Sequence, residues 1–196
     1  MDSFESIIAR QRRALQDAQD RSNAQATASR NAAMERQNLL ALLRPQISHE
    51  ARVVAQALER AGIPGRMAMN VHQLSSIYRG TAVHPGGLGG RPSDRQFRRA
   101  DRRLADAVGS ASTFPVWDMR TSWRYTEHDD TDIFESHGLG SGGVVYKIST
   151  NFGDRGVDII GAEQLDVQNM AETDRLSAIR NGLGGLVARH NLTVNL

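Results

Sequence analysis

The most regular alternation of apolar and polar side chains runs from Val116 to Tyr125. One set of alternate positions holds mostly large apolar or aromatic residues: Trp117, Met119, Thr121, Trp123 and Tyr125. The positions between them hold only charged residues and one serine. Successive side chains of a β-strand point to opposite faces, so the pattern predicts a half-buried strand with one apolar and one polar face. Because both tryptophans of the chain lie here, we expect this strand to organise the core.

Other stretches extend the predicted sheet. Residues 144–150 alternate in the same way, and residues 157–160 are rich in β-branched side chains. The segment between them is rich in Gly, Asn and Asp, which predicts a hairpin. A shorter strand is predicted over residues 66–71, and residues 192–196 are expected to pair as an edge strand. The inward side chains of the shorter strand would be Met67, Met69 and Val71.

Apolar positions spaced three and four residues apart predict three amphipathic helices, over residues 48–61, 94–108 and 174–190. Ser48 is a candidate N-cap for the first of them, and the second opens on a capping box formed by Ser93 and Gln96. The face of the second helix that carries Phe97, Ala100, Leu104 and Ala107 is expected to be buried. Residues 73–79 fit either a short helix or a strand.

The last predicted helix contains three glycines near its middle, Gly182, Gly184 and Gly185. Each costs about 1 kcal/mol relative to Ala in a helix interior. Two interpretations stay open: the helix breaks near Gly182, or the glycines allow it to approach the sheet closely.

Residues 1–44 are predicted to form a long, polar helix that ends before Pro45. Its seam at heptad spacing contains five polar residues among eleven positions, which makes a poor coiled coil. Such a helix buries little apolar surface, so contacts with other segments or other molecules would have to stabilise it. We expect it to dock through its apolar residues, which are Phe4, Ile7, Ile8, Leu15, Leu39 and Leu43.

These elements predict an α+β fold: a small, mostly antiparallel sheet of three to five strands, packed by helices, with a long polar helix at the N-terminus. Residues 1–44 are expected to form an extended helical part. Residues 45–196 would form the α+β domain, with a glycine-rich loop at 84–91 inside it. The three amphipathic helices are expected to cover the aromatic face of the sheet.

Composition narrows the classes of function. The chain has no cysteine, which excludes disulfides, thiolate catalysis and Cys-ligated metal sites and is compatible with a cytoplasmic protein. No apolar run is long enough to cross a membrane, and the charged N-terminus has no apolar core of a signal peptide. We therefore expect no membrane partner.

Arginine supplies nearly all of the positive charge, since Lys147 is the single lysine. A GC-rich bacterial or phage genome would produce this bias through its codons, although selection for guanidinium chemistry would produce it too. Five arginines gather on the helix predicted at 94–108: Arg95, Arg98, Arg99, Arg102 and Arg103. They form either a solvated face or a surface for nucleic-acid phosphates. No aromatic residue is interleaved with them for base stacking.

An acidic segment and a glycine-rich segment join the first two predicted strands. His128, Asp130, Asp132 and His137 lie in the acidic one and could supply metal ligands or acid–base groups. Their spacing matches no known ligand motif, so no metal site and no cofactor are predicted. Residues 138–143 lead into a strand rather than a helix, which favours a flexible connection over a nucleotide-binding loop.

Two hypotheses of function remain, and no catalytic residue supports an enzyme ahead of them. The first is a non-enzymatic interaction or assembly protein that docks through its N-terminal helix on a protein partner or on copies of itself. The alternative is a nucleic-acid-associated protein that uses the five arginines.

Overall fold

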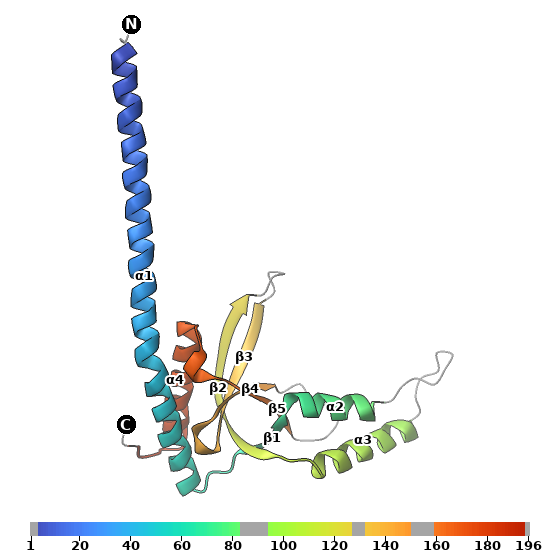
Figure 1. Ribbon diagram of the computed structural model, residues 1–196. Coiled ribbons are helices and arrows are strands. Elements are labelled where there is room, and N and C mark those ends of the chain that lie inside the picture. Colours follow the sequence, from blue (N-terminus) through green and yellow to red (C-terminus); the bar gives the residue numbers. More distant parts are fainter. Residues whose placement is uncertain (1–3, 83–93, 127–131, 150–158, 195–196) are drawn as a thin grey trace, which may run out of the picture. The chain divides into compact units, whose positions relative to one another are not determined.

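The computed structural model describes residues 4–82, 94–126, 132–149 and 159–194 (Figure 1). Helices and a five-stranded sheet make up the described part, which confirms the α+β class. The contacts within the chain define two units, Met1–Leu43 and Arg44–Leu196.

Helix α1 runs from Phe4 to Arg60 without ending at Pro45, so the predicted stop there was wrong. The helix predicted at 48–61 is the last part of α1, and Ser48 is not its N-cap. A proline inside a helix costs about 3 kcal/mol, because it removes one backbone hydrogen bond. Tertiary contacts offset that cost: Arg44 Nε donates to the carbonyl oxygen of Met170 at 2.9 Å, and Ile47 is completely buried.

The sheet closes on itself as a barrel of five strands in chain order. The strands are β1 (Arg66–Asn70), β2 (Phe114–Thr126), β3 (Asp132–Gly140), β4 (Val145–Ser149) and β5 (Ile160–Gln164). Neighbours pair antiparallel except for β1 and β5, whose parallel pairing closes the ring. The return strand of the hairpin was predicted at residues 157–160. It lies further along the chain, as β5, and its antiparallel pairing with β4 is confirmed. Residues 192–194 form no strand.

Strand β1 is buried on both of its faces. Ala68 packs inside the barrel with Val116 and Ile148, whereas Met69 packs on the outside with residues of helices α2 and α3. The predicted inward set was therefore partly wrong. Met67 is 45% exposed, and Val71 already begins α2. An alternation rule assumes one buried face, and β1 has two.

Strand β2 has the predicted apolar face. Trp117 and Met119 are buried and Trp123 is half-buried, while Ser122 and Arg124 are exposed. The alternation is interrupted by a bulge: Asp118 pairs with Gly138, but Ser122 already pairs with Ser136. Arg120, inside the bulge, has a φ of 53°.

Strand β3 replaces the loop that was predicted between residues 126 and 143. Its glycines lie inside the sheet rather than in a flexible connection, since Gly138 and Gly140 are both buried. A Cβ atom on Gly138 would collide with Val116, so the close packing of β2 on β3 requires glycine there. A short 3-10 turn, η1 (Ser141–Gly143), connects β3 to β4.

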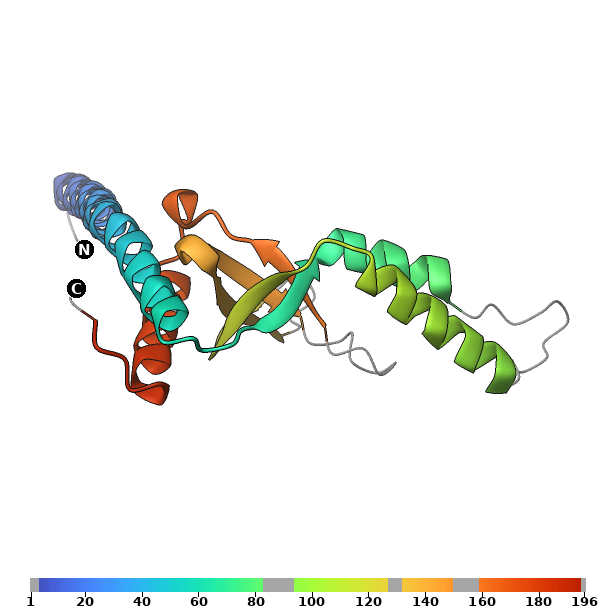
Figure 2. The same ribbon diagram turned by 90° about the horizontal axis from the view of Figure 1, so that it is seen from below.

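Helices α2 (Val71–Thr81) and α3 (Asp94–Gly109) lie side by side (Figure 2). Helix α2 packs on β1 and β5. Its N-cap is Asn70, whose Oδ1 accepts from the backbone N–H of His72 at 3.0 Å, and this resolves residues 73–79 as helix. Ser93, the predicted cap of α3, lies outside the described residues. Phe97 is 48% exposed, contrary to the prediction that it is buried.

Helix α4 (Thr173–Arg189) packs on β2 and is not broken at its glycines. A Cβ atom on Gly182 would lie 2.7 Å from Cβ of Met119. The interpretation of close approach to the sheet is therefore confirmed for Gly182. Gly184 faces open space and needs no such explanation.

Candidate functional site

The apolar residues proposed for docking on α1 lie in the first unit. Every described side chain from Arg10 to Leu39 is exposed, including Leu15 at 71% and Leu39 at 47%. Leu43 is half-buried. The side chains of the remaining three residues, Phe4, Ile7 and Ile8, lie outside the described part. Of the large apolar side chains described in this unit, Leu15, Met34, Leu39 and Leu42 face solvent, whereas Leu40 is buried.

The five arginines predicted to contact nucleic acid all lie on α3, and all are exposed. Four of them line a hollow of about 450 Å³, namely Arg95, Arg98, Arg99 and Arg102. The structure therefore brings these residues together on one surface. Arg103 is exposed on the same helix.

A charged cluster centred on Glu135 joins the barrel to α4. The Glu135 side chain is 2% exposed, and His137 Nε2 lies 2.8 Å from its Oε1 atom. Arg175 of α4 donates to the same oxygen through Nε at 2.7 Å and through Nη2 at 2.6 Å. Lys147 Nζ lies 3.6 Å from Oε2, and the Arg175 guanidinium also lies 5.1 Å from the centre of the Trp123 ring. One carboxylate thus faces three basic side chains.

The protonation of the Glu135 cluster follows from this geometry. Burial by itself raises the pKa of Glu135, but hydrogen bonds from His137 and Arg175 outweigh that effect and leave the pKa below its ordinary value. An ionised carboxylate only accepts hydrogen bonds, so Nε2 of His137 carries the hydrogen that faces it. In a neutral ring Nδ1 is then the acceptor, 3.4 Å from the hydroxyl oxygen of Thr121.

The chain of Thr121, His137 and Glu135 superficially resembles the hydroxyl–imidazole–carboxylate arrangement of nucleophilic catalysis. His137 has no exposed surface, however, so a substrate could not reach its ring. The cluster is instead suited to fasten α4 to β3. Sequence reasoning assigned Glu135 and His137 to a solvated loop, because their partner Arg175 lies 40 residues further along the chain.

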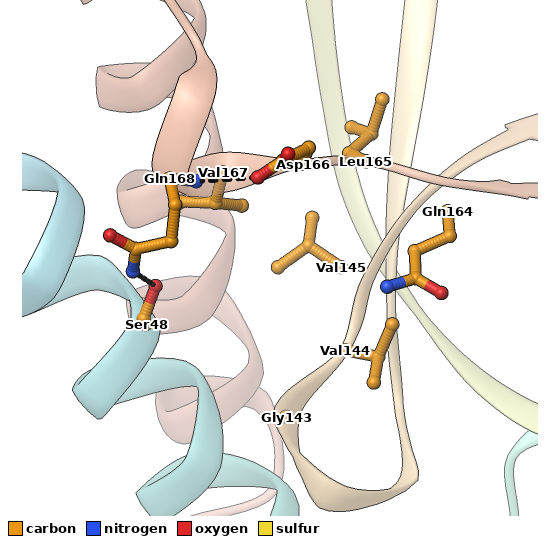
Figure 3. Close-up of a pocket in the computed structure, with 9 residues that line it drawn as sticks. All are labelled: Ser48, Gly143, Val144, Val145, Gln164, Leu165, Asp166, Val167 and Gln168. Carbon is orange, nitrogen blue, oxygen red and sulfur yellow. Dashed lines mark hydrogen bonds between the residues drawn. The ribbon is translucent and has the colours of Figure 1, made fainter.

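A groove lies between the end of η1, the start of β4 and the segment that follows β5 (Figure 3). Its volume is about 480 Å³, and Ser48 and Gln168 face each other across one side, with Gln168 Nε2 donating to Ser48 Oγ at 2.7 Å. Asp166 is the charged residue in its described lining. Its carboxylate caps the 3-10 turn η3 (Val167–Asn169) by accepting from two backbone N–H groups. The groove thus offers polar surface but no activated group.

A second groove of about 460 Å³ lies beside the bulge of β2. Arg189 Nη2 donates to the carbonyl oxygen of Asp118 at 2.6 Å, while the Asp118 side chain accepts from the N–H of Arg120 at 2.7 Å. These contacts hold the bulge and its left-handed residue against the end of α4. Bulges commonly occur where a strand must bend, and α4 packs on this part of β2.

Two of the four residues of the candidate metal or acid–base group suggested by the acidic segment lie in the described part of the chain. His137 is buried in the Glu135 cluster, and Asp132 begins β3. His128 and Asp130 lie outside the described residues. Within the described ranges, no three His, Asp or Glu side chains converge as metal ligands.

Comparisons of this chain with protein-family models, with curated proteins and with solved structures find no match. None of the helices in the described part is both long enough and apolar enough to cross a membrane.

Proposed function

We propose that this protein is a non-enzymatic interaction or assembly protein whose N-terminal helix, residues 4–43 of α1, docks on a partner protein or on a second copy of the chain. The observation that carries the proposal is the exposure of every described side chain from Arg10 to Leu39. We propose a cytoplasmic location, with which a chain without cysteine is compatible.

A helix without tertiary contacts depends on its own hydrogen bonds and side-chain pairs. Isolated helices are marginal in water even when their composition is favourable, because most helical stability in proteins comes from packing. The middle of this helix, residues 22–35, offers only alanines and Met34 as apolar residues. Hydrogen bonds of its side chains include local ones, such as that from Gln16 Nε2 to Asp20 Oδ1 at 3.3 Å. Stable order over this length therefore requires a surface to pack against.

The exposed apolar side chains can supply the docking energy. Leu15 is 71% exposed and Leu42 is 70% exposed. Burying a large aliphatic side chain contributes about 1.5–3 kcal/mol. Several such residues at one interface would be enough to order the helix on a partner.

Hydrogen exchange combined with light scattering on the full chain tests the proposal. If the chain self-associates, its mass will be a multiple of 21.5 kDa and the amides of residues 10–39 will be protected. If the partner is another protein, the isolated chain will be monomeric and those amides will exchange rapidly. A monomer with strongly protected amides in this range would contradict the proposal, since the helix would then need no partner.

A pair of variants locates the docking surface. Leu15→Ser with Leu39→Ser should dissociate an oligomer, or weaken binding to a protein partner, by at least 10-fold. The control, Gln19→Ser with Gln37→Ser, loses similar helix propensity at exposed polar positions and should leave the mass unchanged. Equal effects from the two pairs would show that helix propensity, rather than apolar contact, decides the association.

A further inference from the structure

Helix α3 has two chemically distinct faces. Ala100, Leu104 and Val108 are buried, the last two in a cluster with Met69 and Leu74. The opposite face carries the arginines, which recur at spacings of three and four residues and are all exposed: Arg95, Arg98, Arg99, Arg102 and Arg103. The packing of α3 on α2 thus fixes which way the arginines point.

Positive charge is concentrated on this face of α3. Helix α3 holds five arginines against three aspartates, so its net charge of +2 equals the formal net charge of the whole chain. Four of the guanidinium groups line the hollow of about 450 Å³ described above. A planar guanidinium donates two parallel hydrogen bonds to a phosphate, so several on one surface favour phosphate ligands.

The extent of the arginine face distinguishes the kinds of nucleic acid. Eight residues separate Arg95 from Arg103, which is about 12 Å along a helix. Duplex DNA carries one charge per ~1.7 Å of its axis and so presents roughly seven over that length, about twice as many as one strand. Phe97 is exposed, but at 100° per residue it lies on nearly the opposite side of α3 from the arginines. A base stacked on Phe97 could not share their phosphate contacts, which disfavours a single strand.

We infer that the exposed face of α3 binds the phosphate backbone of duplex DNA without reading its sequence. The arginines supply the contacts, and the buried face of α3 holds them in place. This site lies in the second unit and is independent of docking through residues 4–43.

Fluorescence anisotropy with a labelled 20-base-pair duplex tests this inference on the full chain. Binding should weaken by roughly 100-fold between 50 and 200 mM salt if four phosphates are neutralised. The variant Arg98→Gln/Arg99→Gln/Arg102→Gln should lower the slope of log K against log salt by about 2.7. Its affinity at 50 mM salt should fall at least 10-fold.

Two matched variants control for charge and for folding. Arg52→Gln/Arg60→Gln/Arg124→Gln removes three charges from exposed positions outside both α3 and the docking helix and should keep the wild-type slope. Arg98→Lys/Arg99→Lys/Arg102→Lys keeps the charges and should keep most of the slope. Both glutamine variants should retain the wild-type circular dichroism, because all six residues are exposed.

Four results would overturn the inference. They are a wild-type chain that fails to bind duplex at 50 mM salt, equal slopes for the two glutamine variants, tighter binding to a single strand of the same length, and equally tight binding to poly-glutamate. The last result would point to acidic proteins as the ligand of this face.

Discussion

Glu135 is a buried carboxylate that links three elements of the second unit: β3, β4 and α4. Its carboxylate accepts from Arg175 of α4 and from His137 of its own strand, and it lies near Lys147 of β4. Removing the carboxylate would leave the Arg175 guanidinium, whose side chain is 16% exposed, without its counter-charge, and the buried Nε2 of His137 without its acceptor. Breaking a buried ion pair in this way costs several kcal/mol, although the pair itself need not stabilise the fold by that much.

We expect Glu135→Gln to lower the free energy of unfolding by about 3 kcal/mol, measured by urea denaturation at neutral pH. Glu163→Gln is the matched control, because Glu163 is exposed on β5, which does not pair with the strand of Glu135. It should change stability by less than ~0.5 kcal/mol. A loss at Glu135 no larger than the control's would show that the cluster does not fasten α4.

The pH dependence of stability should report the same carboxylate. The pKa of folded Glu135 lies below the ordinary value of 4.5, so its ionised form stabilises the fold above about pH 4.5. That contribution is lost as the pH falls through the folded pKa. The stability difference between wild type and Glu135→Gln should therefore be largest near neutral pH and should shrink below about pH 4.5. Urea denaturation at pH 7 and pH 3 measures it, and a difference that does not change would contradict the assignment.

At the scale of the element, α4 shows how one residue type can have opposite roles two positions apart. Gly182 lies against Met119, whereas Gly184 faces open space. At Gly182, steric contact with Met119 therefore affects stability more than helix propensity does, because there is no room for a methyl group.

Gly182→Ala should destabilise the protein by roughly 1–2 kcal/mol, since overpacking against Met119 exceeds the gain of about 1 kcal/mol in helix propensity. Gly184→Ala should stabilise it by up to about 1 kcal/mol. Thermal unfolding of both variants measures the difference. Changes of the same sign would contradict the close packing of α4 on β2.

At the scale of the whole molecule, the two units differ in what stabilises them. The second unit holds buried apolar clusters inside and outside its barrel. In the first unit, every described side chain from Arg10 to Leu39 is exposed. The stability of the barrel should therefore be insensitive to the exposed part of α1.

A chain that begins at Gln37 should unfold within about 4 °C of the full chain, which corresponds to about 1 kcal/mol for a protein of this size. The same deletion should abolish any self-association, as measured by light scattering. A much larger loss of thermal stability at protein concentrations where the full chain is monomeric would mean that the N-terminal helix supports the barrel directly.

Elements that bury a single face could be predicted from the sequence, because the spacing of their apolar residues shows which face is buried. The alternation from Val116 to Tyr125, the hairpin of β4 and β5, and the helices at 94–108 and 174–190 were predicted correctly in kind. The five arginines were predicted to share one helix face because helical spacing alone puts them there. Each of these features depends on residues close together in the chain, where the spacing of apolar residues predicts which side chains are buried.

Three features could not be predicted from the sequence, because they depend on contacts between distant segments. They are the closure of the barrel, the formation of strand β3 and the continuity of α1 through Pro45. The parallel pairing of β1 with β5 closes the barrel over one face of β1, and α2 and α3 cover the other face, so alternation no longer marks the inside. Strand β3 looks like a loop because Glu135 and His137 are polar, and they can be buried only because Arg175 arrives from a distant helix. Whether a polar residue is solvated or paired depends on partners far along the chain, which local periodicity does not record.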